Sequence, residues 1–248
     1  MSPSPTLTLH VLPPSHPSRA AEAAIKLKGL EFEKVELVGG EHVAAMQEIY
    51  GEGNSTVPGL VVDEEPVHGS SAIYRKLEEI APDPPLFPAD IAGAVREAER
   101  WGDEELQQLG RNLGWGALHF RPESLGAMGG AGQLDPAGTD FAIKYVRGSW
   151  KYHGITAVQL ADDLEGLPAK LDHVDRLVAD GIIGGDSPNA ADLQIASTLR
   201  VFLIIGDLDD LMADRPAREI ALRWFPDYPG GVPAGAFPAG WVPDRAPS

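Results

Sequence analysis

Residues 12–37, "LPPSHPSRAAEAAIKLKGLEFEKVEL", contain the end of one expected strand, a complete expected helix and a second expected strand. The small and apolar residues from Ala20 to Leu27 repeat at helical spacing, and Gly29 is suited to end that helix. After it, "EFEKVEL" alternates in the way of a strand. A strand, a helix and a strand in immediate succession predict the start of a mixed α/β unit.

The alternation of strands and helices continues on both sides of this stretch. Thr6 to Leu12 predicts a first strand, 42–51 a short helix, 59–69 two strands around an acidic turn, and 70–80 a closing helix. The predicted order is β-α-β-α-β-β-α. We therefore expect a small mixed sheet with helices packed on it.

Prolines mark the end of this unit. The segment 81–94, "APDPPLFPADIAGA", cannot continue a helix and suits an extended linker, and the chain beyond it is helical in pattern. The predicted division is a first domain at 1–82, a linker at 83–91 and an all-helical domain at 92–248 that ends in a Pro- and Gly-rich tail.

Several patterns describe the helical domain. It has a long expected helix at 92–118, one or two at 140–165, and an apolar stripe from Leu167 to Leu177 that ends at Asp180 and Gly181. The longest apolar run, 193–206, is interrupted by polar residues and predicts a buried core helix, not a membrane span. The glycine-rich stretch 124–140 fits no phosphate-binding spacing and predicts a loop, and the last two dozen residues predict a covering without regular structure.

Composition excludes several classes of function. The chain has 37 acidic and 20 basic residues, a formal net charge of −17, which is the wrong sign for tracking nucleic-acid phosphates. It contains no cysteine, which excludes disulfides, thiolate metal ligands and a cysteine nucleophile. Any sulfur chemistry must therefore use a thiol brought by a ligand. No secretory signal and no membrane span are visible, so we expect a cytoplasmic protein without a membrane partner.

Two motifs of the first domain suit a ligand. In "STVPGL", a cis Val57–Pro58 bond would leave the Val57 backbone free to pair with a peptide-like ligand; the alternative is an ordinary trans proline at a strand edge. In "HGSSAI", Ser70 and Ser71 precede a helical pattern, where unpaired N–H groups suit a carboxylate. The alternative there is a serine cap that binds no ligand.

With these motifs, "SHPSRA" at 15–20 and a helical second half, nearly the whole chain resembles the cytosolic glutathione transferases. The resemblance is closest to their theta-like serine type, as a divergent member. It implies the α+β class, with a thioredoxin-like first domain and an all-α second domain. It assigns the catalytic role to Ser15 and, through "VELVGGEH", a thiol-binding role to His42, beside Val57, Pro58, Ser70 and Ser71.

The resemblance gives Ser15 a physical task. A free thiol has a pKa of about 8.5. A hydroxyl that donates to the thiolate contributes roughly 1.5 to 3 kcal/mol, equivalent to a fall of about 1 to 2 pKa units, and the helix N-terminus adds a favourable dipole. The alternative reading makes Ser15 a solvated turn residue. We expect Ser18 to cap the helix and His16 to be exposed.

The resemblance extends into the helical half. "SPNAADLQIA" at 187–196 is similar to the family's buried capping box, with Asn189 as the cap and Asp192 as its reciprocal partner. An electrophile site could use aromatic residues, although most aromatics at helical spacing belong to a core. The candidates are Trp101, Trp115, Phe120 and Trp150.

The family also implies the partners. We expect glutathione or another small thiol as cosubstrate, a hydrophobic electrophile, no permanently bound cofactor or metal, a homodimer and a role in detoxification. Two positions depart from the pattern: Gly69 stands where the family has an acidic residue or glutamine, and Thr56 where theta-type members carry a lysine. Three functions follow: a glutathione transferase, which we favour, a transferase for another thiol, or a binding or scaffolding protein without turnover.

Overall fold

The first part of the chain forms a four-stranded sheet in the order β2-β1-β3-β4. The computed structural model describes residues 5–245. β1 (Leu7–Val11) is parallel to β2 (Glu33–Glu36), whereas β3 (Gly59–Val62) is antiparallel to both β1 and β4 (Glu65–His68). These are the strands that the sequence predicts.

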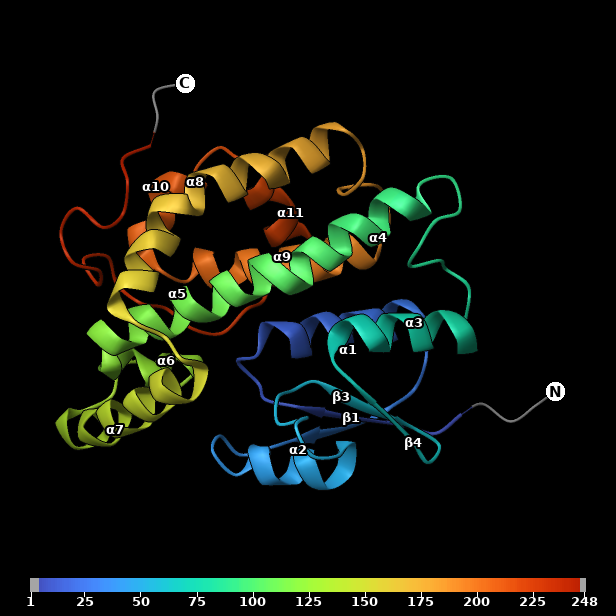
Figure 1. Ribbon diagram of the computed structural model, residues 1–248, viewed down its shortest axis with the longest axis horizontal. Helices are drawn as coiled ribbons and strands as arrows, with labels where there is room; N and C mark the ends of the chain where they lie inside the picture. Colours follow the sequence, from blue (N-terminus) through green and yellow to red (C-terminus); the bar gives the residue numbers. More distant parts are fainter. Residues whose placement is uncertain (1–4, 246–248) are drawn as a thin grey trace.

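Helices cover both faces of this sheet (Figure 1). α1 (His16–Leu27) and α3 (Ser70–Ile80) lie together on the face turned toward the helical part, and α2 (His42–Tyr50) lies on the other. α1 ends as predicted: Gly29 has a φ of +64°, which favours glycine. Its alanine face is buried, so α1 can pack closely against both α3 and the helical part.

The remaining elements are helical and follow the segment 81–91. They are α4 (Ala92–Trp101), a π-helical turn (Gly102–Leu106), α5 (Gln107–Phe120), a 3₁₀ turn (Pro122–Ser124), α6 (Leu125–Met128), α7 (Pro136–His153), α8 (Ala157–Ala179), α9 (Ala190–Leu203), a second 3₁₀ turn (Gly206–Leu208), α10 (Asp209–Met212) and α11 (Pro216–Trp224). The molecule thus has the predicted α+β architecture of a sheet-containing first part and an all-helical second part.

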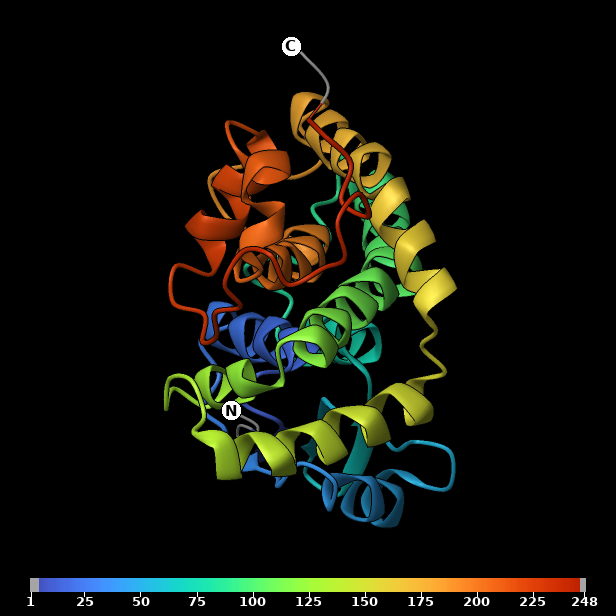
Figure 2. The same cartoon turned by 90° about the vertical axis from the view of Figure 1, so that its left-hand side faces the viewer.

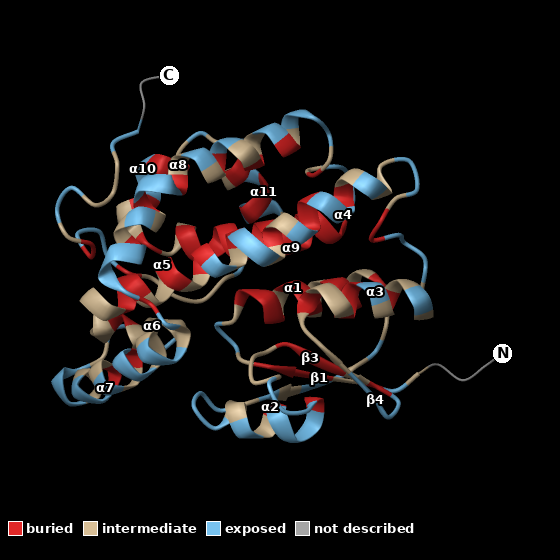
Figure 3. Cartoon of the chain, viewed as in Figure 1, coloured by how far each residue is buried: buried red, intermediate tan, exposed pale blue. Residues whose placement is uncertain are grey.

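α9 is the centre of the helical core (Figure 3). Every residue from Ala190 to Phe202 is buried, as the apolar run 193–206 predicts. α9 contacts α4, α5 and α11 within the helical part and α1 of the first domain. It therefore joins the two cores. No helix within 5–245 is long and apolar enough to cross a membrane.

The glycine-rich stretch 124–140 is more regular than predicted. It contains α6 and the first turns of α7, which begins at Pro136. The Asp135 side chain caps α7 by accepting the Gly138 N–H at 2.8 Å. An aspartate at the N-cap followed by proline strongly favours the start of a helix. The prediction of a loop gave more weight to the many glycines of this stretch. The tail has no helix over 225–245 and a single isolated bridge, between Ile205 and Val232.

α7 lies against the first domain (Figure 2). A Cβ placed on Gly39, in the loop before α2, would lie 2.4 Å from the Tyr145 hydroxyl of α7. Farther along α7, the Tyr152 hydroxyl shares a hydrogen bond with the Ser55 hydroxyl, just before β3. α7 thus connects the helical part to the segments that precede α2 and β3.

Candidate functional site

Strand register brings the predicted thiol-binding residues to one edge of the sheet. Because β1 and β2 are parallel, the chain leaves both at the same edge, toward Ser15 after β1 and His42 after β2. β3 is antiparallel to β1 and β4 to β3, so the chain enters β3 and leaves β4 at that edge too. Val57 precedes β3 and Ser70 opens the helix after β4. Four segments distant in sequence therefore meet there.

Ser15 is the N-cap of α1. Its Oγ accepts the Ser18 N–H at 3.4 Å, and its side chain is partly exposed. The prediction that Ser18 caps this helix is wrong. Helical geometry already begins at His16, and Pro17 fits the first turn because it needs no N–H partner there. The Ser15 O–H remains free to donate while its oxygen accepts the cap bond.

His16 is buried, contrary to the prediction that it is exposed. Its ring lies against α5, where a Cβ on Gly110 would be 3.7 Å from Nε2, and Nε2 has no hydrogen-bond partner among the described residues. Burial, helped by the charge of Arg111, lowers the pKa of His16 to about 3. His16 can be buried because Gly110 of α5 leaves space for its ring. The sequence around His16 does not indicate this burial.

The buried imidazole predicts acid sensitivity. Because the pKa of His16 is about 3 in the folded protein and near 6.5 when unfolded, the unfolded state takes up the proton as the pH falls below about 6.5. Stability is then lost by about 1.4 kcal/mol per pH unit. Between pH 6 and 4.5 we expect His16 to remove about 2 kcal/mol of unfolding free energy. Urea titrations of wild type and His16→Gln would measure this, and equal pH slopes would contradict it.

The Val57–Pro58 bond is cis. The Val57 N–H and C=O make no hydrogen bond with any residue of 5–245. His68 holds the preceding residue, with its Nε2 2.7 Å from the Thr56 carbonyl oxygen. Tyr50 packs beneath Gly59, where a Cβ would lie 2.2 Å from its ring. Neighbouring side chains thus hold the segment around Val57 in place, while its own N–H and C=O have no hydrogen-bond partner among residues 5–245.

The two serines after β4 have different surroundings. α3 begins at Ser70, and its N-cap is Gly69 with a φ of +89°, so neither serine is the cap. Ser70 Oγ is buried and has no hydrogen-bond partner in residues 5–245, whereas Ser71 Oγ accepts a hydrogen bond from Arg75. Ser70 therefore combines a free hydroxyl with the unpaired N–H groups of a helix N-terminus.

His42 is the first residue of α2. Its Nδ1 lies 3.1 Å from the Gly40 N–H, and burial lowers its pKa. The ring is therefore neutral near pH 7. Besides burial, its charge is one of the causes that lower the pKa of His153 at the end of α7. The predicted contact residue thus lies where α7 meets the first domain.

The aromatic candidates lie in different surroundings. Trp101 meets the His173 ring of α8 edge-on, with centroids 4.4 Å apart. Phe120 packs against Phe237 and Trp241 of the tail.

Trp115 is the aromatic candidate closest to the α7 contact. It packs against Tyr145 and His153, and its carbonyl oxygen accepts the Trp150 indole N–H at 2.9 Å. The four aromatics thus do not form one cluster, and Trp115 and Trp150 are the pair associated with α7.

Arg111 is a residue that the sequence reasoning missed. It lies on α5, where a basic side chain on a helix is normally read as a solvated residue. Its charge reaches His16 at the start of α1 and His153 at the end of α7. Burial first, then Arg111 and His42, lower the pKa of His153 to about 4. The neighbours of Arg111 on α5 contact both the first domain and α7, because Gly110 packs against His16 of α1 and Trp115 packs against Tyr145 and His153 of α7.

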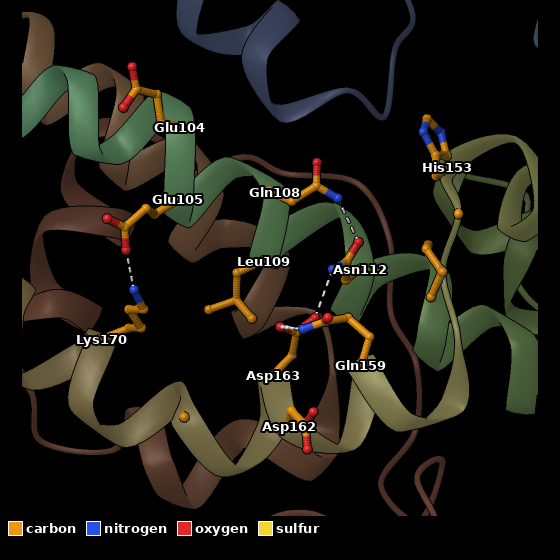
Figure 4. Close-up of a pocket in the computed structure, with 13 residues that line it drawn as sticks. Glu104, Glu105, Gln108, Leu109, Asn112, His153, Gln159, Asp162, Asp163 and Lys170 are labelled. Atoms are coloured by element: carbon orange, nitrogen blue, oxygen red, sulfur yellow. Dashed lines mark hydrogen bonds and ion pairs between the residues drawn. The ribbon is translucent and has the colours of Figure 1, made fainter.

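A separate pocket of about 500 Å³ opens between α5 and α8 (Figure 4). Its wall carries a chain of hydrogen bonds: Gln108 to Asn112 at 2.8 Å, Asn112 to Asp163 at 2.7 Å, and Gln159 to Asp163 at 2.9 Å. None of the predicted site residues lines it. His153 at one end belongs both to this pocket and to the surroundings of Arg111.

The sheet-containing part of the chain matches a known family of domains. Residues 9–85 match the family model of the glutathione S-transferase N-terminal domain. The chain is similar to the beta-etherase LigF from Sphingobium sp. strain SYK-6, with 20% identity, a TM-score of 0.60, and coverage of 88% of this chain and 99% of that one. No curated protein sequence matches it.

Two further structures are similar over nearly their whole length. A glutathione S-transferase from Methylobacterium radiotolerans, in complex with glutathione sulfonate, has 22% identity and a TM-score of 0.57 over 97% of this chain and 99% of that one. A glutathione S-transferase from Sinorhizobium meliloti 1021 has 19% identity and a TM-score of 0.57, over 93% and 96%. Residues 9–85 therefore match a glutathione S-transferase N-terminal domain, and the chain as a whole shares the fold of these structures.

Proposed function

We propose that this protein is a serine-type, theta-like transferase that activates the thiol of glutathione, or of a related small thiol, for attack on an electrophile. The observation that carries the proposal is the meeting of Ser15, Val57 and Ser70 at one sheet edge. Glutathione sulfonate in the similar Methylobacterium radiotolerans structure supports this choice of thiol. The absence of cysteine fits a protein whose nucleophilic sulfur comes with its substrate.

In the proposed reaction the thiol first loses its proton to solvent. The Ser15 hydroxyl donates to the resulting thiolate, with roughly 1.5 to 3 kcal/mol of stabilisation, and the α1 N-terminus adds its partial positive charge. A sulfur lone pair then forms the bond to the electrophilic carbon. The leaving group departs with the electron pair of the bond that breaks.

Binding of the thiol would use the backbone and one helix end. The free N–H and C=O of Val57 suit a peptide-like ligand paired in the manner of an added strand. Ser70 and the N-terminus of α3 suit a carboxylate, and His42 lies at the other end of the same edge. Gly69 and Thr56 supply no charge, so we expect weaker affinity than a site with both charged partners would have.

Titration calorimetry with reduced glutathione tests the first step, and turnover of glutathione with 1-chloro-2,4-dinitrobenzene tests the second. We expect saturable binding near or below millimolar, corresponding to about 4 kcal/mol or more, followed by release of chloride. If glutathione binding does not saturate, other small thiols would be titrated in the same way. Binding without turnover of any electrophile would favour the scaffolding alternative.

We also propose that the protein is a cytoplasmic homodimer with a role in detoxification. Closed two-fold pairs are the commonest oligomers of soluble proteins. Size-exclusion chromatography with light scattering measures the mass directly, and a monomer at micromolar concentration would contradict the proposed assembly.

Gly69→Glu tests whether the missing acidic residue weakens glutathione binding. We expect tighter binding, since the γ-glutamyl end would regain a charged partner, together with a loss of about 1 to 3 kcal/mol of stability because Gly69 has a φ of +89° and a ψ of 146°, a conformation that favours glycine. Calorimetry and urea unfolding measure the two effects. Gly69→Ala is the matched control, which adds the strain without the carboxylate. Equal glutathione affinity in both variants would contradict the prediction.

A further inference from the structure

Arg111 forms no ion pair with a carboxylate in the described part of the chain. Its Nη1 donates to Gln108 Oε1 at 2.6 Å, and within 5–245 no carboxylate oxygen lies within 4.0 Å of its guanidinium. By contrast, Arg215 contacts two aspartates at 2.7 Å. A guanidinium has five N–H donors in a planar fork, and within the described residues the Arg111 side chain donates one hydrogen bond, to Gln108.

The environment of Arg111 makes an unpaired charge costly. The side chain is partly buried, and burial lowers its pKa. The carboxylate whose charge acts on it is that of Asp103, which forms no ion pair or hydrogen bond with it among the described residues. His16 and His153 are neutral near pH 7, with pKa values of about 3 and 4. An incoming anion would therefore meet a positive charge that is already partly desolvated.

The part of α5 around Arg111 lies beside the proposed thiol site. Gly110, the residue before Arg111, packs against His16, which directly follows Ser15. Trp115, one helical turn after Arg111, packs against Tyr145 and His153 of α7. This part of α5 thus lies between the start of α1 and the end of α7.

An aromatic side chain accompanies this cation on α5. Trp115 lies four residues after Arg111, so the two occupy the same face of the helix. Its indole is partly exposed and packs against Tyr145 and His153 of α7. A flat apolar surface beside a free guanidinium suits an aromatic molecule that carries an acidic group.

We propose that Arg111 binds an anionic group of the electrophilic substrate, a carboxylate, sulfate or phosphate, whose aromatic or apolar body rests near Trp115. The inference rests on the proposed function and names the substrate class of the second site. The electrophile is favoured over the thiol because Arg111 comes from α5 of the helical part, whereas the thiol contacts come from the sheet edge. A planar guanidinium holds such a group through two parallel hydrogen bonds.

A matched pair of electrophiles tests this specificity. 1-Chloro-2,4-dinitrobenzene is neutral and 4-chloro-3,5-dinitrobenzoate carries a carboxylate; both lose chloride when the thiolate attacks. For Arg111→Gln we expect kcat/KM for the benzoate to fall about 10- to 100-fold relative to the neutral compound, with KM for the thiol unchanged. Arg147→Gln, an exposed arginine of α7, is the control and should keep the wild-type ratio. An equal loss for both electrophiles would overturn the proposal, because Arg111 would then act on the thiolate or the fold.

A binding measurement separates this proposal from the proposed activity. 3,5-Dinitrobenzoate lacks a leaving group and can be titrated by tryptophan fluorescence, with sulfate and phosphate as competitors that identify the preferred anion. We expect about 10- to 100-fold weaker binding in Arg111→Gln, partial retention in Arg111→Lys and no change in Arg147→Gln. Arg111-dependent binding in a protein without turnover would support the anion site and reject the transferase. Binding that ignores Arg111 in a correctly folded variant would overturn the inference even in an active enzyme.

Discussion

Asp192→Ala is expected to lower the free energy of unfolding by about 4 kcal/mol, since each buried donor left unpaired costs about 1 to 3 kcal/mol. The Asp192 carboxylate is fully buried at the start of α9. It accepts the Asn189 N–H at 3.0 Å, the Gly184 N–H at 2.7 Å and the Trp224 indole N–H at 3.1 Å. Alanine leaves all three donors without a partner. Urea unfolding at pH 7, followed by tryptophan fluorescence, measures the loss.

Two variants serve as controls for this prediction. Asn189→Ala removes the reciprocal half of the capping box, which accepts the Ala191 and Asp192 N–H groups at 2.9 and 3.1 Å. It should cost about 1 to 2 kcal/mol. Asp192→Asn keeps one acceptor oxygen and should fall between the two. If Asp192→Ala lowers the free energy of unfolding no more than Asn189→Ala does, the prediction is wrong. Asp192 would then act only as part of the capping box, and its hydrogen bonds to Gly184 and Trp224 would add no stability.

Ser15→Ala is expected to lower turnover about 10- to 100-fold while the thiol still binds. The lost hydrogen bond to the thiolate is worth roughly 1.5 to 3 kcal/mol, and each 1.4 kcal/mol is about tenfold in rate. The hydrogen bond stabilises the thiolate more than the protonated thiol. The substitution should therefore lower kcat more than it lowers the affinity for the thiol. The pH dependence of thiolate absorbance in the complex measures the cause, since the pKa of the bound thiol should rise by about 1 to 2 units.

The cap bond of Ser15 adds a second effect that must be measured separately. Loss of the oxygen that accepts the Ser18 N–H should cost about 1 kcal/mol of stability. Ser18→Ala is the matched control: it removes a buried hydroxyl without a partner one turn away and keeps the cap. Wild-type turnover in Ser15→Ala, or an equal loss in Ser18→Ala, would contradict the assignment of Ser15.

Much of the site could be predicted because its members lie next to local signals. Pro58 marks the start of β3, Gly29 the end of α1, and Asn189 with Asp192 the start of α9; each depends on backbone geometry within a few residues. The N-cap of α1 was predicted at the wrong serine because Ser15 and Ser18 are both residues that favour an N-cap position. Only the actual helix start at His16 distinguishes them.

The sequence by itself determined the strands, most of the helices, the lack of a protein thiol, the acidic charge and the cap of α9, because periodicity and turn chemistry act between near neighbours. Tertiary structure alone decided that His16 is buried against Gly110, that Arg111 forms no ion pair with any carboxylate of residues 5–245, and that α7 reaches Gly39 and Ser55. These facts depend on which distant segments pack together and how much water their contact excludes. The sequence pattern around a charged helical residue is the same whether its side chain contacts solvent, a carboxylate or a substrate.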